Sequence, residues 1–162
     1  MTSSCRRFGH PVLLGPSVAA LLLAAVGCSS TDAAPSITDP TPSAEAAAYC
    51  RALHEELPRT VAGLDRGGTG TESGLTAQWG DGAIVLRCGV PRPAKMDDPS
   101  SKAIEANGVN WMLEQPDDGG PLFTTTHRKA YVEVRLSEAY AHDASPLAAF
   151  APAVRKTVPS AL

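Results

Sequence analysis

The stretch Leu75–Val90, LTAQWGDGAIVLRCGV, decides the fold, because apolar and polar residues alternate on both sides of a glycine-rich turn. Alternation with a period of two is typical of a β-strand with one buried face. The stretch therefore predicts a hairpin, with strands over Leu75–Trp79 and Ala83–Val90 joined by a turn at Gly80–Gly82. Three residues of the second strand share the predicted inner face: Ile84, Leu86 and Cys88.

Three later segments alternate in the same way and predict further strands. They are Val109–Leu113, Leu122–Thr126 and Tyr131–Leu136, of which the last two form a second hairpin. The run Arg66–Gly74, which precedes the first hairpin, is rich in glycine and predicts a mobile loop.

A helix is predicted on each side of this run of strands. The first has Ser43 as a candidate N-cap and ends at Pro58. Its apolar stripe consists of Ala46, Cys50, Leu53 and Leu57. The second follows Ser145-Pro146, and Pro152 within it is expected to kink the helix or delay its start.

The order helix, strands, helix indicates an α+β fold. We expect an antiparallel sheet of four or five strands packed on an N-terminal and a C-terminal helix, in a single domain over residues 44–160. Residues 28–43 are rich in proline, serine, threonine and alanine, lack periodicity, and predict a disordered tether.

Residues 1–27 have the pattern of a lipoprotein signal peptide. A basic start at Arg6 and Arg7 precedes an apolar segment, which is too short for a membrane-spanning helix. The segment ends in LAAVGC, so Cys28 is the predicted lipid acceptor. The triplet Ala25–Gly27 also suits ordinary signal cleavage, which would give a secreted protein instead.

The net charge of the chain and its predicted export limit the kinds of partner that we expect. Removing residues 1–27 takes away two positive charges and no negative ones, so the net charge of −3 becomes more negative. An acidic exported domain is a poor candidate for binding nucleic acid. We expect contact with the membrane through the lipid anchor, on the extracytoplasmic side of the cell membrane, and an envelope protein as a further partner.

Cys50 and Cys88 are predicted to form a disulfide. Cys5 lies in the predicted signal and Cys28 is the lipid acceptor, so these two remain in an oxidising compartment. Both lie on predicted core-facing positions, one on the first helix and one on the second strand. The alternative, a redox-active pair, is disfavoured because the chain has no C-x-x-C motif.

The sequence carries no recognisable catalytic, metal or cofactor motif. His54-Glu55-Glu56 lacks the second histidine of a zinc helix and is interpreted as a solvated helix face. His127 and His142 could join a catalytic triad only through the tertiary fold. The candidate binding surface is the outer face of the sheet, where four side chains alternate away from the core: Arg87, Tyr131, Glu133 and Arg135. The alternative is that Arg87 and Glu133 form a cross-strand ion pair without a role in binding.

Several runs together resemble a known family. They are Tyr49-Cys50, Ala77–Asp81, Val85–Pro93 (VLRCGVPRP), Asn107–Trp111, Thr124–Arg128 and Tyr131–Val134. The chain resembles domain-of-unknown-function family 3515, an actinobacterial family of exported proteins. The resemblance implies a small secreted or lipid-anchored envelope protein with a paired cysteine, and it implies no activity. We therefore expect a non-enzymatic accessory or binding module; the alternatives are a small-ligand binder and a hydrolase without a recognisable motif.

Overall fold

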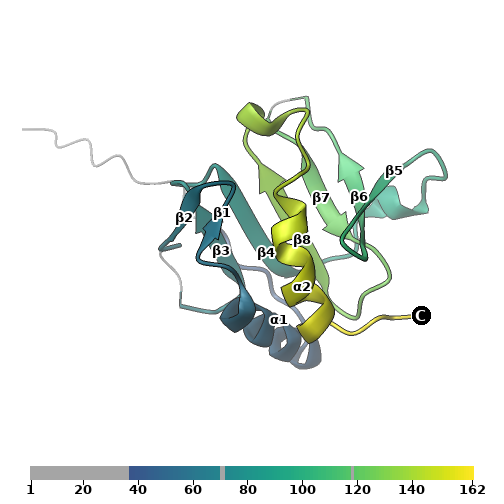
Figure 1. Cartoon of the computed structure of the whole chain (residues 1–162). Coiled ribbons are helices and arrows are strands. Elements are labelled where there is room, and N and C mark those ends of the chain that lie inside the picture. The colour runs from purple at the N-terminus through teal and green to yellow at the C-terminus, as the bar shows by residue number, and fades with distance from the viewer. Residues whose placement is uncertain (1–36, 70–71, 118) are drawn as a thin grey trace, which may run out of the picture. The chain divides into compact units, whose positions relative to one another are not determined.

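The computed structural model describes residues 37–69, 72–117 and 119–162. The predicted signal peptide, Cys28 and the first part of the predicted tether lie outside the described residues. The described chain is α+β, as predicted, and has two α-helices and eight strands in one antiparallel sheet. Its strand order is β1-β2-β3-β4-β8-β7-β6-β5 (Figure 1). The strands are β1 Thr60–Val61, β2 Leu64–Gly67, β3 Thr76–Trp79, β4 Ile84–Val90, β5 Lys102–Ala106, β6 Val109–Glu114, β7 Leu122–Thr125 and β8 Tyr131–Leu136.

The prediction of four or five strands was wrong, because three strands lack a strong alternating pattern. β1 has two residues, and the residues of β2 and β5 are exposed or only half-buried. The first two residues of the predicted mobile loop, Arg66 and Gly67, belong instead to β2. They pair with Trp79 and Gln78 of β3. β2 and β5 are held by pairing with β3 and β6, whereas β1 pairs with β2 and buries Val61 in the core.

The predicted β3–β4 hairpin is confirmed at the centre of the sheet. Trp79 pairs with Ile84 and Ala77 with Leu86, so all four face the core. The turn between the strands uses left-handed backbone at Gly80 and Asp81, with φ of 57° and 52°. Position 80 also has no room for a side chain, because a Cβ on Gly80 would lie 2.7 Å from Cδ1 of Leu64.

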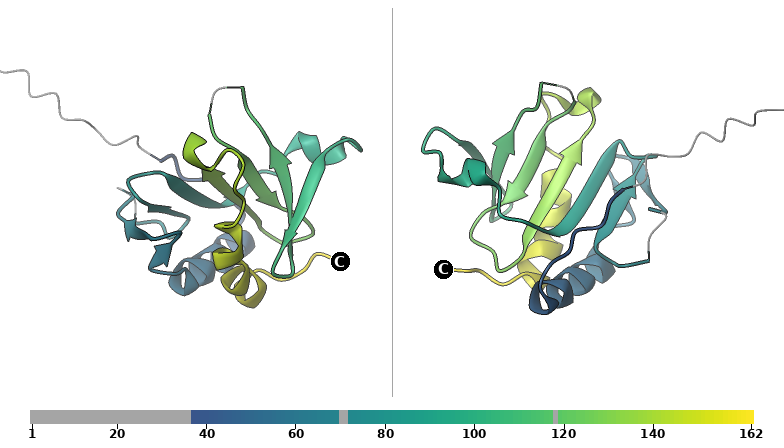
Figure 2. Two further views of the ribbon diagram at one scale, coloured as in Figure 1. Left: turned by 45° about the horizontal axis from the view of Figure 1, so that its top comes forward. Right: turned by 180° about the vertical axis from the view of Figure 1, so that it is seen from behind.

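Both helices cover the same face of the sheet, as the views in Figure 2 show. α1 spans Ala44–Glu56, and the Ser43 hydroxyl caps it by accepting from the Ala46 amide at 3.3 Å. α2 spans Leu147–Thr157. Between helices and sheet, Trp79 and Phe150 are fully buried, with ring centroids 5.0 Å apart. Pro152 lies inside α2, so of its two expected effects, a kink or a delayed start, the delayed start does not occur.

The predicted disulfide is present and joins α1 to β4. Cys50 and Cys88 are both 1 % exposed, and their Cα atoms are 5.4 Å apart. The bridge therefore crosses the interface between helix and sheet inside the core.

Residues 37–43, within the range predicted as a tether, lie against the sheet face opposite the helices (Figure 2, right). The Thr76 hydroxyl donates to Oδ1 of Asp39 at 3.0 Å. Pro42 packs on Gly89, where a Cβ would come within 2.7 Å of the proline ring. The ordered domain therefore includes residue 37.

Candidate functional site

The four residues predicted to form a binding face all lie on the outer side of the sheet, but two of them are paired with each other. Arg87 of β4 is opposite Glu133 of β8 in the register. Their charges meet at 2.7 Å, and the Glu133 side chain is only 10 % exposed. This ion pair is part of the sheet, so Arg87 and Glu133 are not free to bind a charged ligand.

The other two residues lie apart. Arg135 is exposed, next to Leu122 of β7 in the register. Tyr131 is half-buried at the start of β8 and lines a cleft. The structure therefore does not bring the four predicted residues into one site.

The cleft beside Tyr131 lies between the β4–β5 connection and the outer face of the sheet. The connection contains a short 3-10 helix, η1 (Ala94–Asp97). We call this hollow, with a volume of about 340 Å³, the methionine cleft. Its lining residues are Arg92, Met96, Asp98, Ser101, Lys102, Ala103, Met112, Thr126, His127, Tyr131 and Ala161.

Two methionines from different elements give the cleft its apolar part. Met112 is 2 % exposed and faces outward on β6, opposite Ala103 of β5. Met96 comes from η1 and is half-buried. Sequence reasoning missed both, although an apolar residue at an outward position of an alternating strand is a signal that something covers it.

The rim of the cleft is polar, and most of its charges are neutralised locally. Arg92 meets Asp97 at 2.8 Å, and Lys95 meets Asp98 at 2.6 Å. Hydrogen bonding to Arg92 lowers the pKa of Asp97, and the same bond raises the pKa of Arg92. Lys102, at the start of β5, has no ion-pair partner in the part of the chain that the structure describes. Its side chain shares a face of the sheet with Leu113, its partner in the register, so the ammonium lies on the opposite side of the sheet from Met112.

His127 forms the far end of the cleft rim in the β7–β8 turn. It has left-handed backbone, with φ of 55°. Its carbonyl accepts from the Ala161 amide at 2.9 Å, so the C-terminal segment helps to hold this turn. No hydrogen bond or ion pair joins the imidazole of His127 or His142 to a carboxylate in residues 37–69, 72–117 and 119–162.

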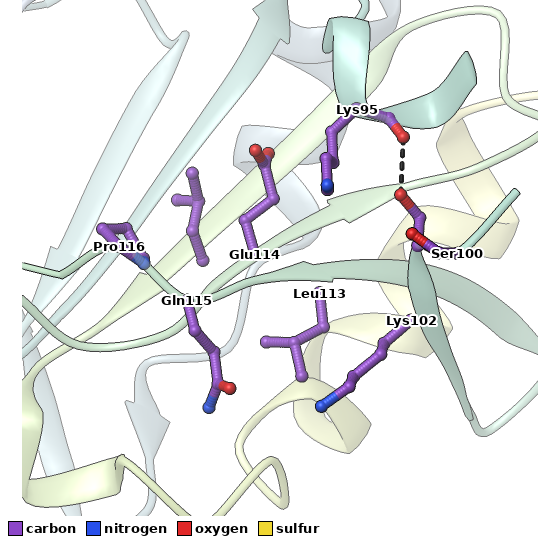
Figure 3. Close-up of a pocket in the computed structure, with 9 residues that line it drawn as sticks. Lys95, Ser100, Lys102, Leu113, Glu114, Gln115 and Pro116 are labelled. Carbon is purple, nitrogen blue, oxygen red and sulfur yellow. Dashed lines mark hydrogen bonds between the residues drawn. The ribbon is translucent and has the colours of Figure 1, made fainter. Parts of the chain in front are cut away.

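A second hollow lies on the other side of the β4–β5 connection (Figure 3). Glu114 points toward Lys95, whereas Leu113, Gln115 and Lys102 extend to the other side of β6. The Ser101 hydroxyl donates to the Lys95 carbonyl at 2.6 Å and so links the end of the β4–β5 connection to η1. Opposite charges line this hollow, so it favours neither an anion nor a cation.

His54 is not the solvated side chain that the sequence analysis expected. It is half-buried on α1 and its Nε2 lies 2.8 Å from Nη2 of Arg66. Arg66 also lies over the Trp79 ring, 5.8 Å from its centroid. Sequence reasoning missed Arg66, because it placed this residue in a loop. Among the described residues there is no group of three or more histidine, cysteine or acidic side chains that could hold a metal ion.

Residues 12–162 match the model of a family described as Protein of unknown function (DUF3515). The chain belongs to this family. The match confirms the resemblance seen in the sequence and covers the whole described domain. No curated protein and no solved structure matches the chain. Among the described residues, no helix has the length and apolar character needed to cross a membrane.

Proposed function

We propose that the protein is a tethered binding module of the cell envelope, without catalytic activity, that holds a small amphipathic ligand in the methionine cleft. The signal-like residues 1–27 and Cys28 support a location outside the cytoplasmic membrane, with a lipid anchor. Secretion without the anchor is the alternative.

The observation that carries the proposal is the combination of apolar floor and polar rim in one hollow. Met112 and Met96 line a volume of about 340 Å³, which lies in the range of small-ligand sites. Methionine side chains adapt to ligands of irregular shape because they are unbranched and polarisable. An apolar group can therefore replace water against Met96, the half-buried member of the pair.

The rim supports a ligand with a hydrogen-bonding end. Thr126 and Tyr131 offer hydroxyl groups to it. Few convergent polar groups around an apolar floor fix the orientation of a ligand. The arrangement favours a molecule with one apolar part and one part that accepts hydrogen bonds.

A titration with 8-anilinonaphthalene-1-sulfonate, an apolar dye with one negative charge, tests the site. We expect a single saturable site in the wild type and a loss of affinity of about tenfold or more in Ala103→Trp, which fills the cleft from an exposed position. Ala139→Trp, at an exposed position of the 3-10 helix η2 (Glu138–Tyr140), is the matched control and should bind as the wild type does. Equal affinity in both variants would place the dye elsewhere and contradict the proposal.

A partner protein of the envelope is the second candidate, and the position of β5 favours it. β5 is the terminal strand of the sheet, and Ser101, Lys102 and Ala103 at its start also line the cleft. The free backbone groups of an edge strand can pair with an extended segment of another chain. Cross-linking from position 103 in intact cells would capture such a partner; a cross-link to a small molecule alone would support the first candidate.

A further inference from the structure

We infer that the hollow between α1 and β2 is a binding site for an oxyanion, a carboxylate or a phosphate group, formed by Arg66, Arg59 and His54. The hollow has a volume of about 570 Å³ and lies apart from the methionine cleft, since the two share no lining residue. The inference is independent of the proposed function.

Arg66 is held in one orientation by three contacts. Its Nη1 donates to the His54 carbonyl at 3.2 Å, and its Nη2 donates to Nε2 of His54 at 2.8 Å. Its guanidinium lies 5.8 Å from the centroid of the Trp79 ring, within the range of a cation–π contact. A guanidinium cannot accept a hydrogen bond, so Nε2 of His54 is the acceptor and this imidazole is neutral.

No carboxylate of the described residues forms an ion pair with Arg66. Arg66 is half-buried, and none of the ion pairs of the described residues includes Arg59 either. A partly buried cation without a counter-charge is costly, because it loses hydration and gains no Coulomb attraction. A guanidinium has five N–H donors, and His54 occupies two of those of Arg66. The remaining donors are available to a ligand.

A second arginine, Arg59, lines the same hollow. The Arg66 amide donates to the Arg59 carbonyl at 2.8 Å, which keeps the two residues side by side. Two guanidinium groups on one hollow are stabilised together by a shared anion, and the planar guanidinium matches carboxylate and phosphate oxygens. Asp65 also lines the hollow and opposes an anion, although its Oδ1 already accepts from the Thr60 hydroxyl at 3.1 Å.

Calorimetric titration of the purified full chain with inorganic phosphate, and separately with acetate, tests the site at constant ionic strength. We expect saturable binding of at least one of them, with a Kd on the order of 1 mM, and the stronger of the two identifies the ligand class. Arg59→Gln, at an exposed position, should weaken this binding about tenfold through loss of a charge-assisted hydrogen bond. Asp65→Asn should strengthen it.

Arg135→Gln, which removes an exposed arginine on the other face of the sheet, is the matched control and should not change the affinity. Absence of saturable binding for both anions would overturn the inference. So would an equal loss in Arg59→Gln and Arg135→Gln, because it would show nonspecific attraction by net charge. Ala103→Trp should leave anion binding intact, so failure of the methionine cleft and failure of this site are distinguishable.

Discussion

The side-chain amide of Asn107 donates a hydrogen bond to the backbone carbonyl of Ala148 across 3.2 Å. In an α-helix this carbonyl would accept from the amide four residues later, but that residue is Pro152, which has no N–H. Asn107 lies in the β5–β6 turn with φ of 48°, a left-handed conformation that asparagine tolerates. The hairpin therefore supplies the donor that the proline removes from α2.

Asn107→Gly tests this contact, because glycine keeps the left-handed turn and deletes only the amide. We expect a loss of about 1 kcal/mol in the free energy of unfolding, the net value of a typical hydrogen bond. Thermal unfolding monitored by circular dichroism measures it. In the background Pro152→Ala, where the helix regains its own donor, the same substitution should cost much less. Equal costs in both backgrounds would show that the contact does not compensate for the proline.

The behaviour of Pro152 shows which parts of the fold the sequence could predict. The central hairpin and the inner positions of β4, β6 and β8 follow from alternation, which is a local property. The carbonyl that Pro152 leaves without a donor is bound by Asn107, which is 41 residues away from Ala148 in the chain. β1, β2 and β5 depend on pairing with neighbours, so a local pattern could not reveal them.

The candidate sites were less accessible to prediction than the fold. Alternation placed Arg87 and Glu133 on the outer face, where a cross-strand ion pair was one of two interpretations, and the register confirms that pair. The methionine cleft depends on the path of the β4–β5 connection, which brings Met96 over Met112. That path has no periodicity from which it could be derived. The predicted disulfide succeeded because compartment and core-facing position restricted the choice to one pair.

Arg87→Met should destabilise the domain, because it leaves the nearly buried Glu133 without its partner. Removing one member of a buried pair exposes the other to a desolvation penalty, and we expect a loss of about 1–3 kcal/mol in the free energy of unfolding. Chemical denaturation measures this loss. Adding Glu133→Gln to Arg87→Met should recover part of it. Additive losses in the double variant would argue against coupling across the sheet.

Replacing both Cys50 and Cys88 by alanine should lower stability by about 4 kcal/mol, the chain-entropy value for a closed loop of 38 residues. The reason is that the unfolded chain gains conformational freedom. Denaturation of the oxidised wild type and of the double variant measures the difference. Each single variant should lose a similar amount. A reduced wild type as stable as the oxidised form would contradict the expectation.

His54 should make stability depend on pH. Burial, and then the charge of Arg66, lower the pKa of His54 below its ordinary value of 6.5, while the Thr76 backbone and Glu55 oppose this shift less strongly. As pH falls below 6.5, the unfolded chain therefore takes up a proton before the folded chain does, and folding stability decreases. The melting temperature should decrease more between about pH 7.5 and pH 5.5 in the wild type than in His54→Gln. This variant keeps a hydrogen-bond acceptor for Arg66 but has no titrating group. A parallel fall in both proteins would assign the pH dependence to other groups.

Cys28→Ala should release the domain from the membrane or block removal of residues 1–27, because only an acylated cysteine would hold an acidic domain at the membrane. Since the ordered domain includes residue 37, the predicted tether between Cys28 and that point is short. If residues 28–36 form the predicted tether, their root-mean-square span of about 15 Å would keep residue 37 close to the bilayer. Fractionation of cells and medium, followed by mass spectrometry of the mature N-terminus, measures the outcome.

Ser29→Ala is the matched control and should remain membrane-bound. Unchanged membrane retention of Cys28→Ala would exclude the lipid anchor, and release of wild-type protein with an unmodified Cys28 would establish ordinary secretion instead.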